Sequence, residues 1–327
     1  MSPRMPTAVL DRALDVTVVP GYGSPGYRLR SRGWGARVPE GALHGREVLV
    51  TGASSGIGEA ACRQLVEAGA TAHMLVRDEA RGEAARARVA SGGPGEAVPH
   101  LCDVSDLDSV SEFAARFAAE VPALSGVIHN AGVLTGSRER SPQGIELTFA
   151  TAVAGPFLMT RLLLGPLRSG GGARVVWVSS GGALTAKLES DDLQLEAREF
   201  DGARFYAHAK RAQVVLAGLF AAREDHRIGF HSMHPGWVDT PGLARSLPRF
   251  HGLMGPLLRD TAQGADTAVW LLACPEADRH PGALWHDRRP RSPYRLPGTR
   301  ESATDRERLW RELIRLTEAD ADRQGGK

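Results

Sequence analysis

The chain has 327 residues, of which 42% are hydrophobic, and its 40 Lys and Arg against 38 Asp and Glu leave a formal net charge of +2. This balance gives no indication of binding to nucleic acid or to an anionic membrane. No apolar run approaches the roughly 20 residues that span a bilayer, so we expect no transmembrane segment. The three cysteines lie far apart without Cys or His at metal-binding spacing, which argues against disulfides and a zinc site and favours a reducing, cytoplasmic location.

Residues 1–45 are rich in Gly, Pro and Arg and have no sustained hydrophobic period. We predict that they form an N-terminal extension that packs against the main domain. Interleaved aromatic and basic side chains leave a second interpretation open, a patch that faces a membrane surface or covers a substrate. These side chains are Tyr22, Tyr27, Trp34, Arg28, Arg30 and Arg32.

Residues 46–290 are predicted to form one α/β domain. Short apolar runs rich in β-branched residues alternate with longer helical stretches, an order typical of βαβ units and a parallel sheet covered by helices on both faces. The runs are 48–50, 72–76, 127–129, 175–178 and 228–231. Residues 291–327 form a C-terminal extension, in which Leu309, Leu313 and Leu316 predict an amphipathic helix.

A glycine-rich turn directly follows the first predicted strand. Its spacing is Gly-x-x-x-Gly-x-Gly, and a helical stretch follows it as far as Gly69. Glycine allows the backbone to approach a pyrophosphate closely, and the amides at the positive end of the next helix attract its charge. We therefore predict a dinucleotide site at Gly52, Ser54, Ser55, Gly56, Ile57 and Gly58.

The end of the second predicted strand distinguishes the two nicotinamide nucleotides. An acidic residue at this place binds the ribose hydroxyls of NAD. The chain has Arg77 after Val76 instead, and a guanidinium can form paired hydrogen bonds with the additional phosphate of NADP. We predict a preference for NADP(H); the alternative is a surface arginine in an Arg-rich protein.

Tyr206 and Lys210 are four residues apart in a predicted helix, so their side chains leave the same face. Lysine is rare in this chain, with only Lys187 and Lys327 besides Lys210. An ammonium beside a phenol favours the phenolate and lowers the pKa of the phenol. We predict a centre for proton transfer; the alternative is a solvated helical pair.

Four motifs in this order resemble the short-chain dehydrogenase/reductase family: the glycine turn, Asn130-Ala131-Gly132, Ser179-Ser180 and the Tyr206/Lys210 pair. The resemblance extends over roughly residues 45–290. The second half is most similar to the branch called dehydrogenase/reductase family member twelve, through segments 191–194, 200–202, 232–242 and 262–267. The family implies a Rossmann-type, doubly wound, seven-stranded parallel sheet with helices on both faces.

By this resemblance, the reaction is reversible hydride transfer between NADP(H) and an alcohol or carbonyl compound. Ser180 holds the substrate oxygen, Tyr206 gives or takes its proton, and Lys210 binds the nicotinamide ribose and lowers the pKa of the phenol. We do not expect Ser179 to share this role, because alternation along the strand directs it to the opposite side. Further cofactor residues implied are Asp103, Val104, Asn130, Ala131, Gly132, Tyr206, Lys210, Pro235, Gly236, Val238 and Thr240.

Ala152 departs from the family pattern, which has an Asn here that helps to order a water chain to the lysine. An alanine side chain forms no hydrogen bond, and Thr151 points about 100° away around the helix. His208 lies on roughly the opposite face from Tyr206, and we interpret it as a packing or interface residue. The departure motivates an alternative function, a catalytically impaired nucleotide-binding regulatory or interaction protein. A third possible function is epimerase or dehydratase chemistry on a sugar nucleotide. Such enzymes usually have a larger C-terminal substrate domain, for which the about 40 residues after Asp287 are too few.

The substrate pocket is expected to involve segments 181–205 and 241–260. The second segment is rich in leucine and carries three arginines, a composition that fits an apolar lid with a basic edge. We expect a lipophilic alcohol, aldehyde or ketone as substrate; alternatively, the leucines only seat the lid on the core. Related enzymes often pair through the helices that hold Ala152 and Tyr206, which leaves a homo-oligomer open.

Overall fold

The computed structural model describes residues 8–34, 38, 41–224 and 226–318. At its centre lies an eight-stranded sheet with the order β3-β2-β1-β4-β5-β6-β7-β8. The strands are β1 (Glu47–Thr51), β2 (Thr71–Val76), β3 (Glu96–Leu101), β4 (Gly126–His129), β5 (Ala173–Val178), β6 (Ile228–Met233), β7 (Leu284–His286) and β8 (Arg289–Arg291). The predicted doubly wound parallel sheet is confirmed, since every pairing from β3 to β7 is parallel.

The strand count differs from the seven implied by the family, because a short edge strand is added. Asp287 and Arg288 both have positive φ, 52° and 56°, and turn the chain back so that β8 pairs antiparallel with β7. Tight hairpin turns of this kind need two residues in the left-handed region. Asp287 in this turn is buried.

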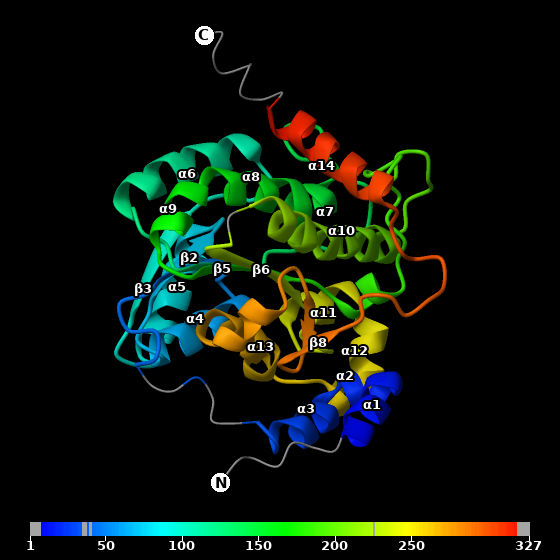
Figure 1. The fold of residues 1–327 in the computed structure, drawn as a ribbon, viewed down its shortest axis with the longest axis horizontal. Coiled ribbons are helices and arrows are strands. Elements are labelled where there is room, and N and C mark those ends of the chain that lie inside the picture. The colour runs from blue at the N-terminus through cyan, green and yellow to red at the C-terminus, as the bar shows by residue number, and fades with distance from the viewer. Residues whose placement is uncertain (1–7, 35–37, 39–40, 225, 319–327) are drawn as a thin grey trace.

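Helices cover both faces of the sheet (Figure 1). One layer holds α4 (Gly56–Glu67), α5 (Glu79–Ala90) and α13 (Thr261–Ala273). The other layer holds α6 (Leu107–Glu120), α7 (Leu147–Phe149), the π-helix η1 (Ala150–Ala154), α8 (Gly155–Leu162), α9 (Leu164–Ser169) and α10 (Gly202–Arg223). The short 3-10 helices are η2 (Gly181–Leu184), η3 (Gly255–Leu257) and η4 (Pro275–Arg279). Each layer encloses its own buried apolar cluster, as a doubly wound sheet requires.

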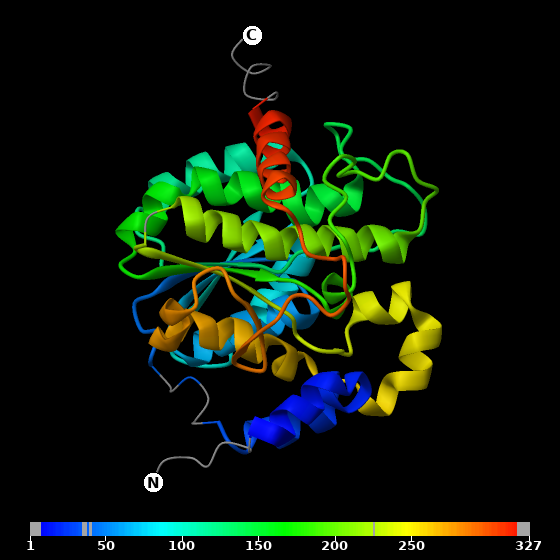
Figure 2. The same ribbon diagram turned by 45° about the vertical axis from the view of Figure 1, so that its right-hand side comes forward.

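The C-terminal helix α14 (Ala303–Glu318) lies outermost on the α10 layer (Figure 2). Leu309 and Leu313 are fully buried, and the Trp310 ring packs edge-on against Phe157 and Phe220, with centroids 5.1 and 5.0 Å apart. The predicted amphipathic helix therefore covers part of the face formed by the long helices. No helix in the described part of the chain is both long and apolar enough to cross a membrane.

Three short helices precede the sheet: α1 (Ala8–Val16), α2 (Val18–Tyr22) and α3 (Ser24–Ser31). They lie beside α12 (Pro248–Met254), which follows α11 (Pro241–Ser246), in both views (Figures 1 and 2). Tyr22, Tyr27 and Arg30 are buried, whereas Arg28 and Arg32 are exposed. The aromatic side chains therefore pack inward against the domain rather than form an outward-facing patch.

Candidate active site

Two adjoining cavities lie at the carboxyl ends of the central strands, where parallel sheets bind ligands. One, the glycine-loop cavity, has a volume of about 640 Å³ and extends from the turn after β1 past the ends of β2 and β3. The other, the tyrosine cavity, has a volume of about 450 Å³ and lies between the ends of β5 and β6, α10 and α11. Ile57, Asn130, Gly132 and Thr240 line both cavities, so an extended ligand can occupy them together.

The turn after β1 has the backbone shape that a closely approaching ligand requires. Gly52 and Gly56 have φ of 68° and 62°, a region that side chains with a Cβ rarely adopt. A Cβ on Gly58 would lie only 2.3 Å from the Gly52 carbonyl oxygen and 2.6 Å from Asn130 Nδ2. Gly58 itself lines neither cavity, and its role is to let α4 pack against the turn.

The other predicted residues divide between the two cavities. The glycine-loop cavity is lined by Gly52, Ser54, Ser55, Gly56, Ile57, Arg77, Asp103, Val104, Asn130, Ala131, Gly132 and Thr240. The tyrosine cavity is lined by Ser180, Tyr206, Lys210, Pro235, Gly236 and Val238. Segments far apart in sequence thus meet at one edge of the sheet.

Asn130 connects β4 to β1 at the floor of both cavities. Its amide Nδ2 donates to the carbonyl oxygens of Thr51 and Gly52, at 3.0 and 3.3 Å. The Thr51 hydroxyl in turn accepts from the backbone amides of Asn130 and Ala131, at 3.0 and 2.9 Å. These bonds hold the two strand ends in place where the sheet changes winding direction.

Two further arginines face the glycine-loop cavity: Arg81, which was not predicted, and Arg245, one of the three arginines expected at the basic edge of the lid. Arg81 lies in the first turn of α5, where the Asp78 carboxylate caps its backbone amide at 2.8 Å, and is exposed together with Arg77. Arg245 reaches the same cavity from α11. The sequence could have indicated Arg81. Asp78 is a typical N-cap residue directly after the second strand, so a helix is expected to begin there and to place Arg81 in its first turn.

Tyr206 and Lys210 lie on one face of α10, as predicted. Asp201 caps this helix by accepting from the backbone amides of Ala203 and Arg204. Lys210 Nζ lies 5.4 Å from the centroid of the Tyr206 ring and donates to the Val178 carbonyl oxygen at 2.8 Å. The ammonium group is therefore positioned by the end of β5 and lies beside the phenol.

The predicted direction of the Tyr206 pKa shift is wrong for this structure. Burial raises the pKa of Tyr206 to about 12 and lowers the pKa of Lys210 to about 7. The cause of both shifts is desolvation, because packed protein disfavours the charged phenolate and the charged ammonium. The phenol is consequently protonated at neutral pH.

The two serines after β5 differ in what their hydroxyls do. Ser179 is buried, and its hydroxyl donates to the Lys210 carbonyl oxygen at 2.8 Å. The Ser180 oxygen accepts from the Gly182 amide at 3.0 Å, which leaves its own proton to be donated within the tyrosine cavity. Ser180 is therefore the serine able to hold a substrate oxygen.

Ala152 lies in the π-helix η1 and is fully buried. Its carbonyl oxygen accepts from Gln213 Nε2 at 2.8 Å, so a glutamine of α10 joins the two helices at the place of the missing Asn. The Thr151 hydroxyl donates to the Leu147 carbonyl oxygen, and Thr151 lines the glycine-loop cavity but not the tyrosine cavity that holds Lys210. His208 is buried and accepts from the Glu189 amide at 3.1 Å, which agrees with a packing role.

The walls of the tyrosine cavity differ in part from the predicted segments. Segment 181–205 contributes only Gly181, Gly182 and Ala203. Other residues of this segment, among them Leu188 and Leu193, are buried in the apolar core instead. Segment 241–260 contributes Gly242, Leu243, Ser246, Leu247 and Phe250, whereas Leu253 is 80% exposed. Trp237, Val133, Leu134, Val178 and Ala207 also line this cavity and were not predicted. Most of this lining is apolar.

Within the residues that the structure describes, no group of three or more His, Cys, Asp or Glu is placed to hold a metal ion. The polar side chains that line the cavities carry hydroxyls, a phenol, one ammonium, guanidinium groups, the Asn130 amide and the carboxylates of Asp78 and Asp103.

Comparison with known proteins gives consistent matches over most of the chain. A sequence model of the short chain dehydrogenase family matches residues 46–248. Dehydrogenase/reductase SDR family member 12 of Bos taurus is 40% identical over 304 residues, which cover 92% of this chain and 94% of the relative. Retinol dehydrogenase 14 of Homo sapiens is 31% identical over 269 residues, 76% of this chain and 80% of the relative.

Among solved structures, an uncharacterized protein from Mycobacterium Paratuberculosis superposes with a TM-score of 0.68 at 25% identity. The match covers 87% of this chain and 98% of the other. The similarity therefore extends beyond the nucleotide-binding segments.

Proposed function

Because the chain belongs to the short chain dehydrogenase family, we propose that it is an NADP(H)-dependent oxidoreductase. It transfers hydride between the nicotinamide and a lipophilic alcohol or carbonyl compound. The observation that carries this proposal is the convergence of Ser180, Tyr206 and Lys210 on an apolar cavity that adjoins the glycine-loop cavity.

The residues present fit a dinucleotide. The positive φ of Gly52 and Gly56 opens a cradle at the start of α4, and the exposed Arg77 and Arg81 offer two guanidinium groups to an additional phosphate. Asp103 lies near the far end of the same cavity, and Thr240 lies where the two cavities meet. The nucleotide, when bound, supplies or accepts the hydride.

The protein's own part in the reaction is to bind and protonate oxygen. Ser180 donates a hydrogen bond to the substrate oxygen, and Tyr206 donates the proton as negative charge develops on that oxygen. A phenol that is protonated at neutral pH suits carbonyl reduction, which requires a proton donor. Lys210, held by the Val178 carbonyl, stands beside the phenol to restore its proton.

The substrate class follows from the wall of the tyrosine cavity. Trp237, Leu243, Leu247 and Phe250 present apolar surface around the three polar groups. Apolar pockets with a few convergent polar groups orient apolar ligands by a single polar end. A relative named retinol dehydrogenase is consistent with such substrates.

Replacing Tyr206 by Phe tests this function. We expect turnover of apolar aldehydes and ketones to fall about 100-fold or more, while affinity for NADPH stays within about twofold, because the substitution removes only the proton donor. Tyr294→Phe is the matched control, since its hydroxyl bonds Glu301 and lines neither cavity. Retained turnover in Tyr206→Phe contradicts the role of Tyr206.

The regulatory alternative has its own outcome in the same assay. It rests on Ala152 in place of the family's Asn. If the unaltered protein binds NADPH but oxidises none of it across a broad panel of carbonyl compounds, the protein is a nucleotide-binding regulatory or interaction protein rather than an enzyme.

A further inference from the structure

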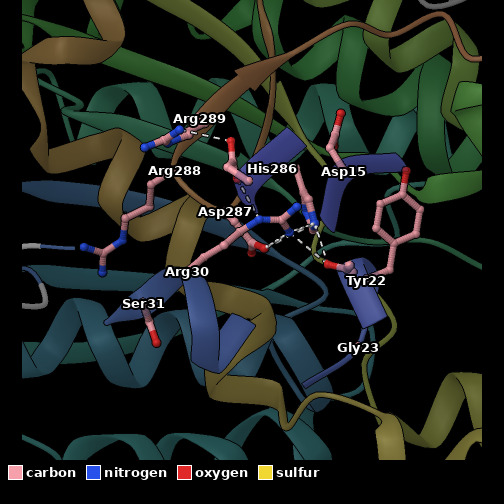
Figure 3. A network of polar contacts seen from close by, with 12 residues as sticks. Asp15, Tyr22, Gly23, Arg30, Ser31, His286, Asp287, Arg288 and Arg289 are labelled. Atoms are coloured by element: carbon pink, nitrogen blue, oxygen red, sulfur yellow. Dashed lines mark hydrogen bonds and ion pairs between the residues drawn. The ribbon is translucent and has the colours of Figure 1, made fainter. Parts of the chain in front are cut away.

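A buried network of charges joins the N-terminal helices to the end of the sheet (Figure 3). The Asp287 carboxylate accepts from Arg259 at 2.6 and 2.9 Å and from Arg30 at 2.7 Å. Arg30 also donates to Asp11 at 2.9 Å. The side chains of Arg30, Arg259 and Asp287 are at most 2% exposed. Residues of α1, α3, the β7–β8 turn and the segment after η3 are thereby held together.

The same arginine fixes a backbone junction next to the tyrosine cavity. Arg259 Nε donates to the Tyr22 carbonyl oxygen at 2.9 Å, and its Nη1 donates to the Pro235 carbonyl oxygen at 3.2 Å. The Trp237 amide also donates to the Tyr22 carbonyl, at 2.9 Å, and the Arg259 amide donates to the Trp237 carbonyl at 2.7 Å. Helix α2 is therefore bonded directly to the segment 235–238, all four residues of which line the tyrosine cavity.

Aromatic rings continue this connection into the cavity. The Tyr22 ring lies edge-on to Trp237, with centroids 6.1 Å apart, and Trp237 lies edge-on to Phe250 of α12, at 5.2 Å. A Cβ on Gly181 would stand 3.6 Å from the Tyr22 ring. Trp237, Phe250 and Gly181 line the tyrosine cavity, whereas Tyr22 lies behind them. Tyr22 thus packs against the side of these wall residues that faces away from the cavity.

We propose that the N-terminal helices are part of the substrate site, with Tyr22 and Arg259 as positioning residues for Trp237. In this arrangement Trp237 is the surface against which an extended apolar chain of the substrate packs. Buried charge pairs contribute little net stability but can specify one conformation. Here the specified conformation is that of the wall, at residues 235–237. The inference deepens the proposed function and rests on it.

The experiment compares Tyr22→Leu with Trp34→Leu. Both remove an aromatic ring from the same N-terminal region, but Trp34 contacts Tyr27 and Arg288 and lines neither cavity. Kinetics are measured with NADPH and straight-chain aldehydes from butanal to decanal. We expect Tyr22→Leu to raise KM for decanal about fivefold and to flatten the dependence on chain length, because apolar packing on Trp237 is lost. Affinity for NADPH and kcat stay within about twofold.

Hydrogen exchange of the backbone amides of residues 236–238 provides a readout that needs no activity. Tyr22→Leu should weaken protection of this segment about tenfold or more, whereas Trp34→Leu should leave it unchanged. The proposal is overturned if Tyr22→Leu changes neither the dependence of KM on aldehyde chain length nor the protection of these amides. It is also overturned if Trp34→Leu changes both as much as Tyr22→Leu does. If the unaltered protein reduces no aldehyde, the proposed function fails, and the exchange result alone decides whether the N-terminal helices support the wall.

Discussion

The two cavities share a wall but are held in shape by different forces. The glycine-loop cavity depends on backbone conformation: positive φ at Gly52 and Gly56, close packing at Gly58, and the bonds from Asn130 to the end of β1. The tyrosine cavity depends on side chains gathered from distant parts of the chain, including α2, α10, α12 and the β7–β8 turn. A substitution on one side should therefore affect nucleotide affinity, and one on the other should affect substrate selection.

The largest effect is expected on the glycine-loop side. Gly58→Val should weaken NADPH binding at least 100-fold and lower the free energy of unfolding by about 3 kcal/mol, because the new side chain overlaps the Gly52 carbonyl. Isothermal titration and urea unfolding measure both quantities. Gly165→Ala is the control, since a Cβ there meets nothing within 4 Å; it should leave NADPH affinity unchanged and should not lower the free energy of unfolding. Normal nucleotide affinity in Gly58→Val would refute the packing argument.

A comparable loss of stability is expected on the other side, without the loss of nucleotide affinity. Asp287→Asn leaves Arg30 and Arg259 buried without their shared carboxylate, which should cost about 3 kcal/mol in urea unfolding. Asp191→Asn removes an 81% exposed partner of Arg308 and should cost under about 0.5 kcal/mol. If Asp287→Asn weakens NADPH binding as strongly as Gly58→Val does, the two cavities do not depend on separate sets of interactions.

The pH dependence of the free energy of unfolding tests the burial of Lys210 in the tyrosine cavity. Burial lowers the pKa of Lys210 to about 7 from 10.5, so between these values the unfolded chain binds more protons than the folded one. The free energy of unfolding therefore gains up to about 1.4 kcal/mol per pH unit from this group as pH rises from 7. Lys210→Met should lose that gain when urea unfolding is compared at pH 7 and 9. An identical slope in both proteins would show that Lys210 does not titrate in this range.

The smallest effect concerns the choice of nucleotide. Arg77→Ala should weaken NADPH binding about tenfold and leave NADH binding unchanged, because only the former carries the additional phosphate. Arg88→Ala, in the same region but paired with Glu59 outside the cavity, serves as control. Unchanged NADPH affinity in Arg77→Ala would remove the basis for the NADP preference.

The contrast between the sides also explains what the sequence could predict. The family, the branch and the doubly wound sheet are confirmed, since the motifs that indicate them are local. Strands β3, β7 and β8 were not located in the sequence, although seven strands were expected, because these strands are short or carry prolines and polar residues. Trp237 and its support by Tyr22 depend on contacts more than 200 residues apart, which no local pattern encodes.

The Tyr206 pKa shows the same limit at a single group. The spacing to Lys210 correctly predicted that the ammonium lies beside the phenol. It could not predict how much protein surrounds both groups, and that burial decides the sign of the shift. Spacing conveys proximity along a helix, whereas desolvation is a property of the assembled fold.

A single-turnover experiment with NADPH deuterated at the transferable position of the nicotinamide tests the central claim most directly. The protein is mixed with the labelled nucleotide and decanal, and the alcohol is analysed by mass spectrometry. The account predicts deuterium on the carbinol carbon with the unaltered protein and about 100-fold slower transfer with Tyr206→Phe. Binding of the labelled nucleotide without any transfer, to decanal or to other apolar carbonyl compounds, would contradict it.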